Sequence, residues 1–185
     1  MQHKNTLDAA RTALVIVDMQ EAFRNSIPDF AELAAHLALV AHAAQVLNIP
    51  ILVTEQYPKG LGRTANEIRA VLPNALAVVE KTSFSACGAP EFNAQLEKTG
   101  ARDVLVCGIE AHICVNQTVH DLLARGFQVH YLVDGIASRH THNKAAAFDK
   151  MQHSGALPST TEMALFELMR DARHEQFKSI QKLIK

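Results

Sequence analysis

Short apolar runs rich in β-branched residues alternate along this chain with longer stretches of helical character. The runs span residues 13–18, 51–54, 77–80, 103–108 and 128–133, and residues 155–159 add a short edge strand. The first run is apolar at every position before Asp18, which is typical of a strand buried on both faces of a parallel sheet. The alternation predicts an α/β fold with three layers, α/β/α, around a mostly parallel, six-stranded, Rossmann-like sheet.

Helical stretches fill the intervals between these strands. They are predicted over residues 30–47, 65–71, 90–98, 113–124, 143–153 and 159–171. Asn48 and Pro50 end the first of them, and Gly126 closes the fourth as a C-cap. The glycines and the proline within residues 56–64 predict a loop. The length of 185 residues fits a single domain over 1–185, with residues 1–12 as a polar N-terminal extension.

The charge balance argues against several classes of partner. Eighteen Lys and Arg residues stand against nineteen Asp and Glu residues, so the formal net charge is −1. Neither nucleic acid nor a membrane is therefore expected as a partner. The chain has no apolar run of about 18 residues, and residues 1–12 lack the apolar core of a secretory signal. The expected location is cytoplasmic, and three cysteines are too few for a disulfide scaffold.

Three polar side chains follow predicted strands. Asp18 closes the first strand, Lys81 follows the third, and Cys114 lies a few residues past the fourth, at a helix start. Ligands bind at the carboxyl ends of the strands in such sheets, so we expect these side chains to lie close together. Residues 18–23 contain no glycine, so the phosphate-binding loop of the usual dinucleotide fold is missing and no such cofactor is expected.

These three residue types suit nucleophilic catalysis. The positive end of the helix dipole and a nearby ammonium both favour the Cys114 thiolate. An adjacent carboxylate can take the thiol proton and return it to a leaving group. Each residue alone also has an ordinary explanation, namely a turn Asp, a solvated Lys and a small core Cys. Their joint placement at one edge of the sheet favours the catalytic interpretation.

Several segments resemble the isochorismatase-like cysteine hydrolases. Residues 13–20 are similar to the opening strand of that family, residues 81–84 to its lysine motif and residues 108–115 to its nucleophile motif. Residues 54–62 and the stretch 154–184 resemble the subgroup of isochorismatase domain-containing proteins, and the similarity runs from about residue 8 to residue 185. The resemblance implies Asp18 as proton acceptor and donor, Lys81 as charge stabiliser and Cys114 as nucleophile.

The resemblance also implies a non-proline cis peptide between Ile109 and Glu110. Backbone N–H groups near Glu110 would then combine with the N–H of Cys114 to form an oxyanion hole. Family members that cleave isochorismate lack the nucleophilic cysteine, so the presence of Cys114 implies hydrolysis of an amide or a related C–N acyl bond.

No metal and no cofactor are expected. Nicotinamidases of the family bind a metal through an Asp-x-His element after the second strand, and residues 54–57 contain no histidine. His140 and His142 form the closest histidine pair, but they lack a third ligand.

A second group of residues is expected to line a substrate pocket because its members follow strand ends or neighbour the nucleophile. The group comprises Gln20, Phe23, Tyr57, Phe84 and His112. Ordinary packing or solvent exposure is an equal alternative for these residues, and His112 is expected to shape the pocket rather than act as the base. Of the other cysteines, Cys107 is predicted in a buried strand and Cys87 in a loop, where it would be open to oxidation.

The combined prediction is a cofactor-independent cysteine hydrolase with a small-molecule substrate. By resemblance the chain is expected to form a homodimer or homotetramer, with the apolar helices near the C-terminus as interface candidates. Two other functions remain open from the sequence. One is a catalytically silent scaffold or binding protein of the same fold, and the other is a thiol redox sensor based on Cys114.

Overall fold

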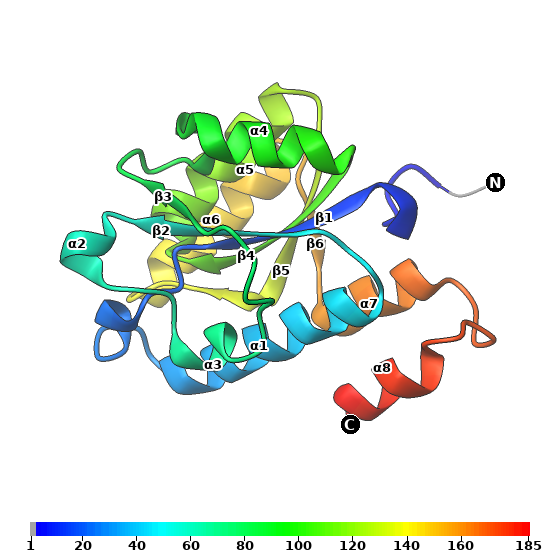
Figure 1. Cartoon of the computed structure of the whole chain (residues 1–185). Coiled ribbons are helices and arrows are strands. Elements are labelled where there is room, and N and C mark those ends of the chain that lie inside the picture. Colours follow the sequence, from blue (N-terminus) through cyan, green and yellow to red (C-terminus); the bar gives the residue numbers. More distant parts are fainter. Residues whose placement is uncertain (1–2) are drawn as a thin grey trace.

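A six-stranded parallel sheet forms the centre of the molecule (Figure 1). The structure, a computed structural model, describes residues 3–185. The strands are β1 (Thr12–Val17), β2 (Ile51–Gln56), β3 (Val79–Lys81), β4 (Asp103–Ile109), β5 (Gln128–Ala137) and β6 (Leu157–Ser159). They lie in the order β3-β2-β1-β4-β5-β6, and every neighbouring pair is parallel. The predicted α/β fold with a six-stranded parallel sheet is therefore confirmed.

Helices cover both faces of this sheet. The longer ones are α1 (Phe30–Val46), α4 (Pro90–Thr99), α5 (Asn116–Ala124), α6 (Thr141–His153), α7 (Thr161–Met169) and α8 (Phe177–Leu183). Short turns are α2 (Pro58–Leu61), α3 (Asn66–Arg69), η1 (Ala9–Arg11), η2 (Glu21–Phe23), η3 (Ala86–Gly88) and η4 (Ala111–Val115). In Figure 1, α4, α5 and α6 lie on one side of the sheet and α1 and α7 on the other, which gives the three layers expected from the sequence.

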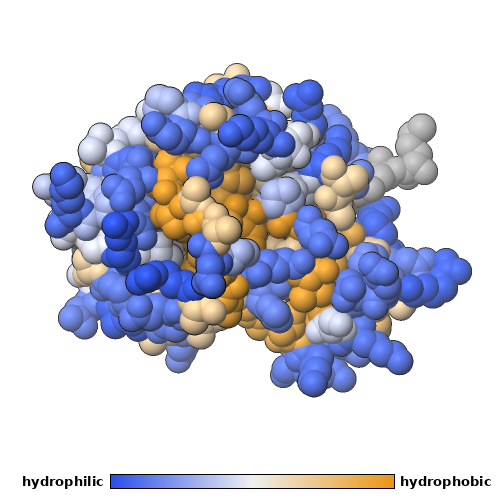
Figure 2. Space-filling view, viewed as in Figure 1, coloured by the Kyte–Doolittle hydropathy of each residue, from blue (hydrophilic) through white to orange (hydrophobic). Residues whose placement is uncertain are grey.

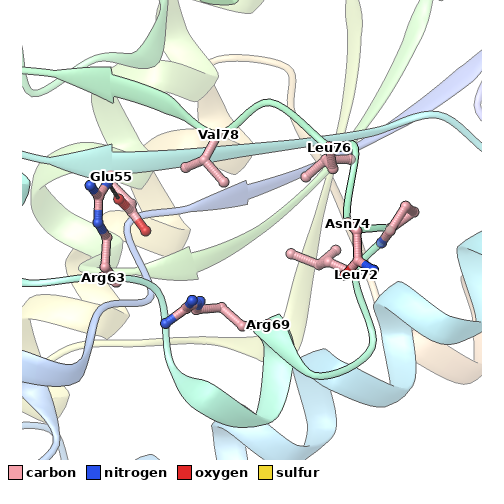
Figure 3. A pocket seen from close by; sticks show the side chains of 8 residues that line it. Glu55, Arg63, Arg69, Leu72, Asn74, Leu76 and Val78 are labelled. Carbon is pink, nitrogen blue, oxygen red and sulfur yellow. Dashed lines mark hydrogen bonds and ion pairs between the residues drawn. The ribbon is translucent and has the colours of Figure 1, made fainter.

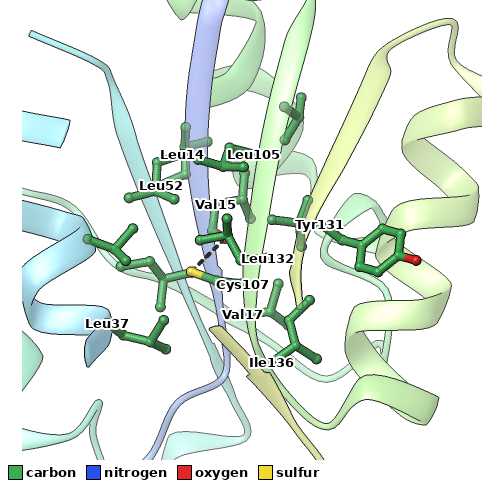
Figure 4. Packing of buried hydrophobic residues seen from close by; sticks show 14 of the residues in the cluster. Leu14, Val15, Val17, Leu37, Leu52, Leu105, Cys107, Tyr131, Leu132 and Ile136 are labelled. Atoms are coloured by element: carbon green, nitrogen blue, oxygen red, sulfur yellow. Dashed lines mark hydrogen bonds between the residues drawn. The ribbon is translucent and has the colours of Figure 1, made fainter. Parts of the chain in front are cut away.

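The core is centred on β1 and β4, the two most apolar strands. Every residue of both strands is buried, because each strand has a neighbour on either side and helices above and below. Leu14 pairs with Leu105 in the register, and Ile16 pairs with Cys107 (Figure 4). The Cys107 thiol lies within this core and donates to the Val15 carbonyl at 3.7 Å. Cys107 is thus a buried strand residue, as the sequence predicts.

Some elements differ from their predicted bounds. Residues 58–61 form the short helix α2 inside the predicted loop, with Pro58 at the helix start, where its missing N–H costs nothing. Strand β3 begins and ends later than predicted, so Lys81 is its last residue rather than the residue after it. Strand β5 continues four residues beyond Val133, to Ala137, past a register shift opposite β4.

The predicted N-terminal extension is partly integrated into the fold. Leu7 is completely buried and belongs to the same hydrophobic cluster as the sheet. None of the helices within residues 3–185 has the length and apolar character needed to cross a membrane. Figure 2 shows apolar surface between α4 and α1 in this view, along the edge of the sheet.

Candidate functional site

The Asp18 side chain lies directly after β1, held by two buried donors. Its backbone adopts the left-handed region with φ 49°, which turns the chain sharply at the end of the strand. The Thr54 hydroxyl of β2 donates to Asp18 Oδ1 at 2.6 Å, and Lys81 Nζ donates to Oδ2 at 2.6 Å. Both oxygens of the carboxylate are therefore anchored by neighbouring strands of the sheet.

The Lys81 ammonium is enclosed by acceptors of the protein. Besides Asp18, it donates to Gln56 Oε1 at 2.8 Å and to the backbone carbonyls of Ser83 and Phe84 at 3.1 and 3.0 Å. Its side chain is completely buried, so this ion pair is shielded from water. A buried ammonium with all its donors engaged is a fixed positive charge rather than a mobile surface lysine.

The Cys114 thiol completes the group that the sequence predicts. The exposed fractions are 2% for Asp18, 4% for Lys81 and 7% for Cys114. Burial, and after it the Asp18 carboxylate, raise the pKa of the Cys114 thiol far above its usual range, although the Lys81 ammonium lowers it. The thiol is thus held in its protonated form, contrary to the expectation that a helix dipole favours the thiolate.

The type of helix around Cys114 also differs from the prediction. Cys114 does not begin the α-helix predicted over residues 113–124. It lies in the π-helical turn η4, and α5 begins only at Asn116. Single π-helical turns often occur at functional sites. Among residues 3–185, no group outside η4 accepts a hydrogen bond from the backbone N–H of Ala111, His112 or Cys114.

The backbone before this turn has two unusual features. The peptide bond between Ile109 and Glu110 is cis, at the position that the resemblance implies. Gly108 has φ 116° and lies so close to β1 that a Cβ atom there would overlap the backbone of Val17. A glycine at this position lets β4 approach β1 closely, which places η4 beside the end of β1.

A cavity of about 220 Å³ is lined by two of these three residues, Asp18 and Cys114. Its polar lining consists of Asp18, Gln56, Glu110, Cys114 and Arg139. Its apolar lining consists of Phe23, Leu61, Phe84, Ile109 and Ile113. Phe84 stands at the rim with 54% of its surface exposed. The cavity therefore has the size for a small molecule, with the thiol and the carboxylate in its wall.

Three residues expected in this pocket lie elsewhere. Gln20 is completely buried, and its side chain bonds the backbone of Gln56 and Gly62, so it supports the wall from behind. Tyr57 is 53% exposed and packs over Gly60 outside the cavity. His112 points toward β5 and α6.

The His112 ring is held by two side chains of that neighbouring region. Its Nδ1 lies 3.1 Å from the Ser138 hydroxyl, and its Nε2 lies 3.3 Å from Asn143 Nδ2. His112 therefore positions η4 against the start of α6 and does not line the cavity.

Four lining residues were not anticipated from the sequence: Gln56, Leu61, Ile113 and Arg139. Gln56 orients Lys81, and its position at the end of β2 is the same strand-end signal that identified Asp18. Arg139 reaches the cavity only because β5 is longer than predicted, so no sequence signal placed it there.

A second cavity of about 290 Å³ lies outside β2, beside α3 (Figure 3). Figure 3 shows the guanidinium groups of Arg63 and Arg69 on one side and apolar side chains such as Leu72 and Leu76 on the other. Arg63 pairs with Glu55 at 3.0 Å and with Glu80 at 2.7 Å. No nucleophile or base of the first site reaches this cavity.

The remaining cysteines and histidines form no further reactive cluster. Cys87 lies buried in η3 rather than in an open loop, and burial raises the pKa of its thiol to about 11. The rings of His140 and His142 stack on each other at 5.4 Å. Within residues 3–185, no set of three or more His, Cys, Asp or Glu side chains is arranged to hold a metal ion.

Comparison with known proteins identifies relatives over most of the chain. The family model of the isochorismatase domain matches residues 12–163. Isochorismatase domain-containing protein 1 from Salmo salar is 42% identical over 177 residues, which cover 95% of this chain but only 62% of the salmon protein.

Two solved structures share the fold. One, described as the MAR1 ribonuclease from Caenorhabditis elegans, has a TM-score of 0.92 and 39% identity, and the match covers 97% of this chain and 92% of that chain. The other is the YcaC gene product from Escherichia coli, described as an octameric hydrolase of unknown specificity. It has a TM-score of 0.88 at 23% identity, and the match covers 100% of this chain and 91% of that chain.

Proposed function

This chain belongs to the isochorismatase family, and from that premise we propose that it is a cofactor-independent cysteine hydrolase that cleaves a small amide or related C–N acyl substrate. Membership of this family supports a hydrolase. The observation that carries the finer proposal is the buried contact between Lys81 and Asp18 in the wall of a cavity that also holds the Cys114 thiol. A nucleophile, a base and a fixed cation beside one small cavity are the parts that acyl transfer requires.

The first half of the reaction forms an acyl-thioenzyme. Cys114 Sγ attacks the carbonyl carbon while the thiol proton moves to the Asp18 carboxylate. The π electrons of the carbonyl move to its oxygen, and the backbone N–H groups of Ala111, His112 and Cys114 supply candidate donors for this oxyanion. The oxyanion collapses, the C–N bond breaks, and the proton on Asp18 passes to the leaving nitrogen.

The second half releases the acid. Water attacks the thioester carbonyl and gives a proton to Asp18. The C–S bond then breaks, and the proton returns from Asp18 to the departing sulfur, which restores the starting thiol. The raised pKa of Cys114 supports this scheme, because a protonated thiol needs a base in contact during the attack.

We expect replacement of the nucleophile to abolish both acylation and turnover. The measurement is a screen of small amides, ureas and acyl-amines by release of ammonia or amine, with intact mass spectrometry of the protein during turnover. Cys114→Ala should show neither product nor added acyl mass. Cys87→Ala, which removes a different buried thiol, is the matched control and should react as the wild type does.

Full turnover by Cys114→Ala would contradict the proposal. Absence of acylation and turnover in the wild type across the screen would instead favour the silent scaffold. A redox sensor predicts a Cys114 thiol that is readily oxidised, and the raised pKa argues against this because the thiolate is the reactive form.

RNA cleavage is the second candidate, and the ribonuclease description of the nematode structure is what favours it. The formal net charge of −1 supplies no general attraction to a phosphate backbone. Incubation of a labelled RNA with the wild type and Cys114→Ala separates the two candidates. Cleavage that is equal in both proteins would place an RNA activity away from Cys114.

A homo-oligomer, as a dimer or a tetramer, remains part of the proposal. The octamer described for the YcaC protein is compatible with association in this fold. The exposed ring of Phe84 at the cavity rim gives a neighbouring subunit an apolar surface beside the site. A cytoplasmic location remains a prediction.

A further inference from the structure

Arg139, a cation in the wall of the proposed catalytic cavity, has hydrogen-bond donors that no group in the described part of the chain uses. Arg139 Nε donates to both carboxylate oxygens of Glu110 at 3.1 Å, and the Arg139 backbone N–H donates to Glu110 Oε2 at 2.9 Å. Among residues 3–185, no group accepts a hydrogen bond from its Nη1 or Nη2. The Nε–H of the guanidinium is therefore engaged by Glu110, whereas the Nη1 and Nη2 groups have donors left for a ligand.

The Glu110 partner does not exhaust the capacity of this guanidinium. Elsewhere in the molecule one arginine serves two carboxylates at once: Arg24 bonds both Glu21 and Glu67. The buried Glu110 side chain, 4% exposed, orients Arg139, which is itself 48% exposed. Arg139 therefore lies between the buried Glu110 carboxylate and the cavity. From this position its remaining donors can bind a second anion.

The rest of the cavity offers no competing cation with free donors. The four acceptors around Lys81 Nζ are all groups of the protein, so Lys81 is committed to holding Asp18. Five of the ten residues that line this cavity are apolar, among them Phe84 and Ile113, and the same lining includes Cys114 and Arg139. This layout suits a molecule with an apolar middle, a carbonyl at one end and an anion at the other.

We propose that Arg139 binds a carboxylate on the acyl part of the substrate, so that the substrate is a half-amide of a short dicarboxylic acid. The inference rests on the proposed function, because it places the amide of that molecule at Cys114. A planar guanidinium binds a carboxylate through two parallel hydrogen bonds, which fixes orientation as well as charge. The methylene groups of the acyl chain then contact the apolar wall, and the distance between the two ends selects the chain length.

Binding is measured first in the Cys114→Ala protein, where the result does not depend on turnover. The probes are malonamate, succinamate and glutaramate, each compared by calorimetry with the uncharged amide in which a methyl group replaces the carboxylate. We expect the best of the three half-amides to bind at least about tenfold more tightly than its uncharged counterpart. Arg139→Met, introduced into the Cys114→Ala protein, should remove this preference for the charged amide. Arg139→Lys in the same background should retain only part of it.

Two further variants guard against misinterpretation. Arg69→Met removes an exposed guanidinium from the second cavity and should leave the preference unchanged; a loss there would place the anion in that cavity. Arg139→Met leaves the buried Glu110 carboxylate without its partner, which can destabilise the fold. The double variant Glu110→Gln/Arg139→Met avoids that charge and should also bind charged and uncharged amides equally.

The outcomes separate this inference from the proposed function. Equal binding of charged and uncharged amides by the Cys114→Ala protein would overturn the role of Arg139, and so would a preference that survives Arg139→Met. If the wild type hydrolyses uncharged amides and the Arg139 variants do so equally well, the hydrolase stands and the inference fails. If half-amides bind through Arg139 but are never acylated onto Cys114, the carboxylate-binding role of Arg139 stands and the hydrolase fails.

Discussion

At the scale of single residues, the site depends on the position of one carboxylate. Asp18 receives the Thr54 hydroxyl on one oxygen and the Lys81 ammonium on the other, each at 2.6 Å. Since the neighbouring thiol is held in its protonated form, its reaction requires a base in a fixed place. The orientation of Asp18 should therefore limit the rate more than the thiolate fraction of the free protein does.

Thr54 is the residue that tests this view, because it touches the carboxylate and does not line the cavity. Thr54→Val keeps the shape of the side chain but leaves one buried Asp18 oxygen without its donor. We expect about a tenfold or larger loss of kcat with little change in KM, because a buried polar group that loses its hydrogen-bond partner costs about 1–3 kcal/mol.

The measurement is steady-state kinetics on the best amide of the screen, with p-nitrophenyl acetate as a second probe of acylation. Thr54→Ser retains the hydroxyl and should recover most of the rate. Unchanged kcat in Thr54→Val would show that Lys81 alone orients Asp18.

The strand ends in the sequence marked three residues that the structure brings to one edge of the sheet. Asp18, Lys81 and Cys114 meet because the carboxyl ends of β1, β3 and β4 share one edge of the sheet. Arg139 carries no such mark, because it follows an irregular extension of β5 that apolar periodicity does not reveal. Tyr57 follows its strand as expected and has φ 38°, but its ring packs over Gly60 and does not line the cavity.

At the scale of elements, the close approach of β4 to β1 positions Cys114, the proposed nucleophile. Gly108 pairs with Val17 in the register, and it permits this approach because it lacks a Cβ atom. Strand β4 then leads through Ile109 and Glu110 into η4, so a small separation of the two strands would also move Cys114 away from Asp18.

Gly108→Ala should therefore damage both stability and activity. The added methyl group meets the backbone of Val17, which cannot rotate aside, and φ 116° is unfavourable for any residue with a side chain. We expect a loss of about 2–4 kcal/mol in the free energy of unfolding, measured by urea denaturation.

Gly100→Ala is the control for backbone strain alone. Gly100 also has positive φ, 69°, but open space surrounds the place where a Cβ atom would stand. It should cost only about 1 kcal/mol. Equal losses in the two variants would contradict a role for close packing at Gly108.

At the scale of the whole molecule, the alternation of apolar runs and helices was sufficient to predict the layers and the parallel sheet. The strand order could not be predicted from this alternation, because the sequence does not show on which side of β1 each later strand is added. The predicted end of the helix over residues 113–124 was accurate because Gly126 marked it as a C-cap. Its predicted start was wrong at η4, because a π-helical turn has the same apolar composition as the α-helix that follows it.

Stability of the whole fold should fall in mild acid because of one buried histidine. His130 lies in β5 with 2% of its surface exposed, and burial lowers its pKa to about 4. In the unfolded chain the histidine has a pKa of about 6.5. Between about pH 6.5 and about pH 4 the unfolded chain therefore binds a proton at His130 that the folded protein does not bind. Stability is therefore lost as the pH falls from about 6.5 toward 4.

We expect His130 to account for about 2 kcal/mol of the difference in unfolding free energy between pH 7 and pH 5. The measurement is urea denaturation at both pH values for the wild type and His130→Leu, since the groups they share cancel in the comparison. The variant should show a smaller loss between pH 7 and pH 5. His42→Gln, which removes an exposed histidine, should behave as the wild type does.

The strand order also sets the sequence in which the site comes together during synthesis. β1 leaves the ribosome before the other five strands of the sheet, yet it ends in the interior of the sheet, with β2 on one side and β4 on the other. Asp18 and Lys81 are both made before Cys114, whose place beside them requires β4 to pair with β1. A nascent chain that has not completed β4 therefore holds Asp18 and Lys81 without Cys114, and it gains this thiol only after the strand that pairs with β1 in the centre of the sheet.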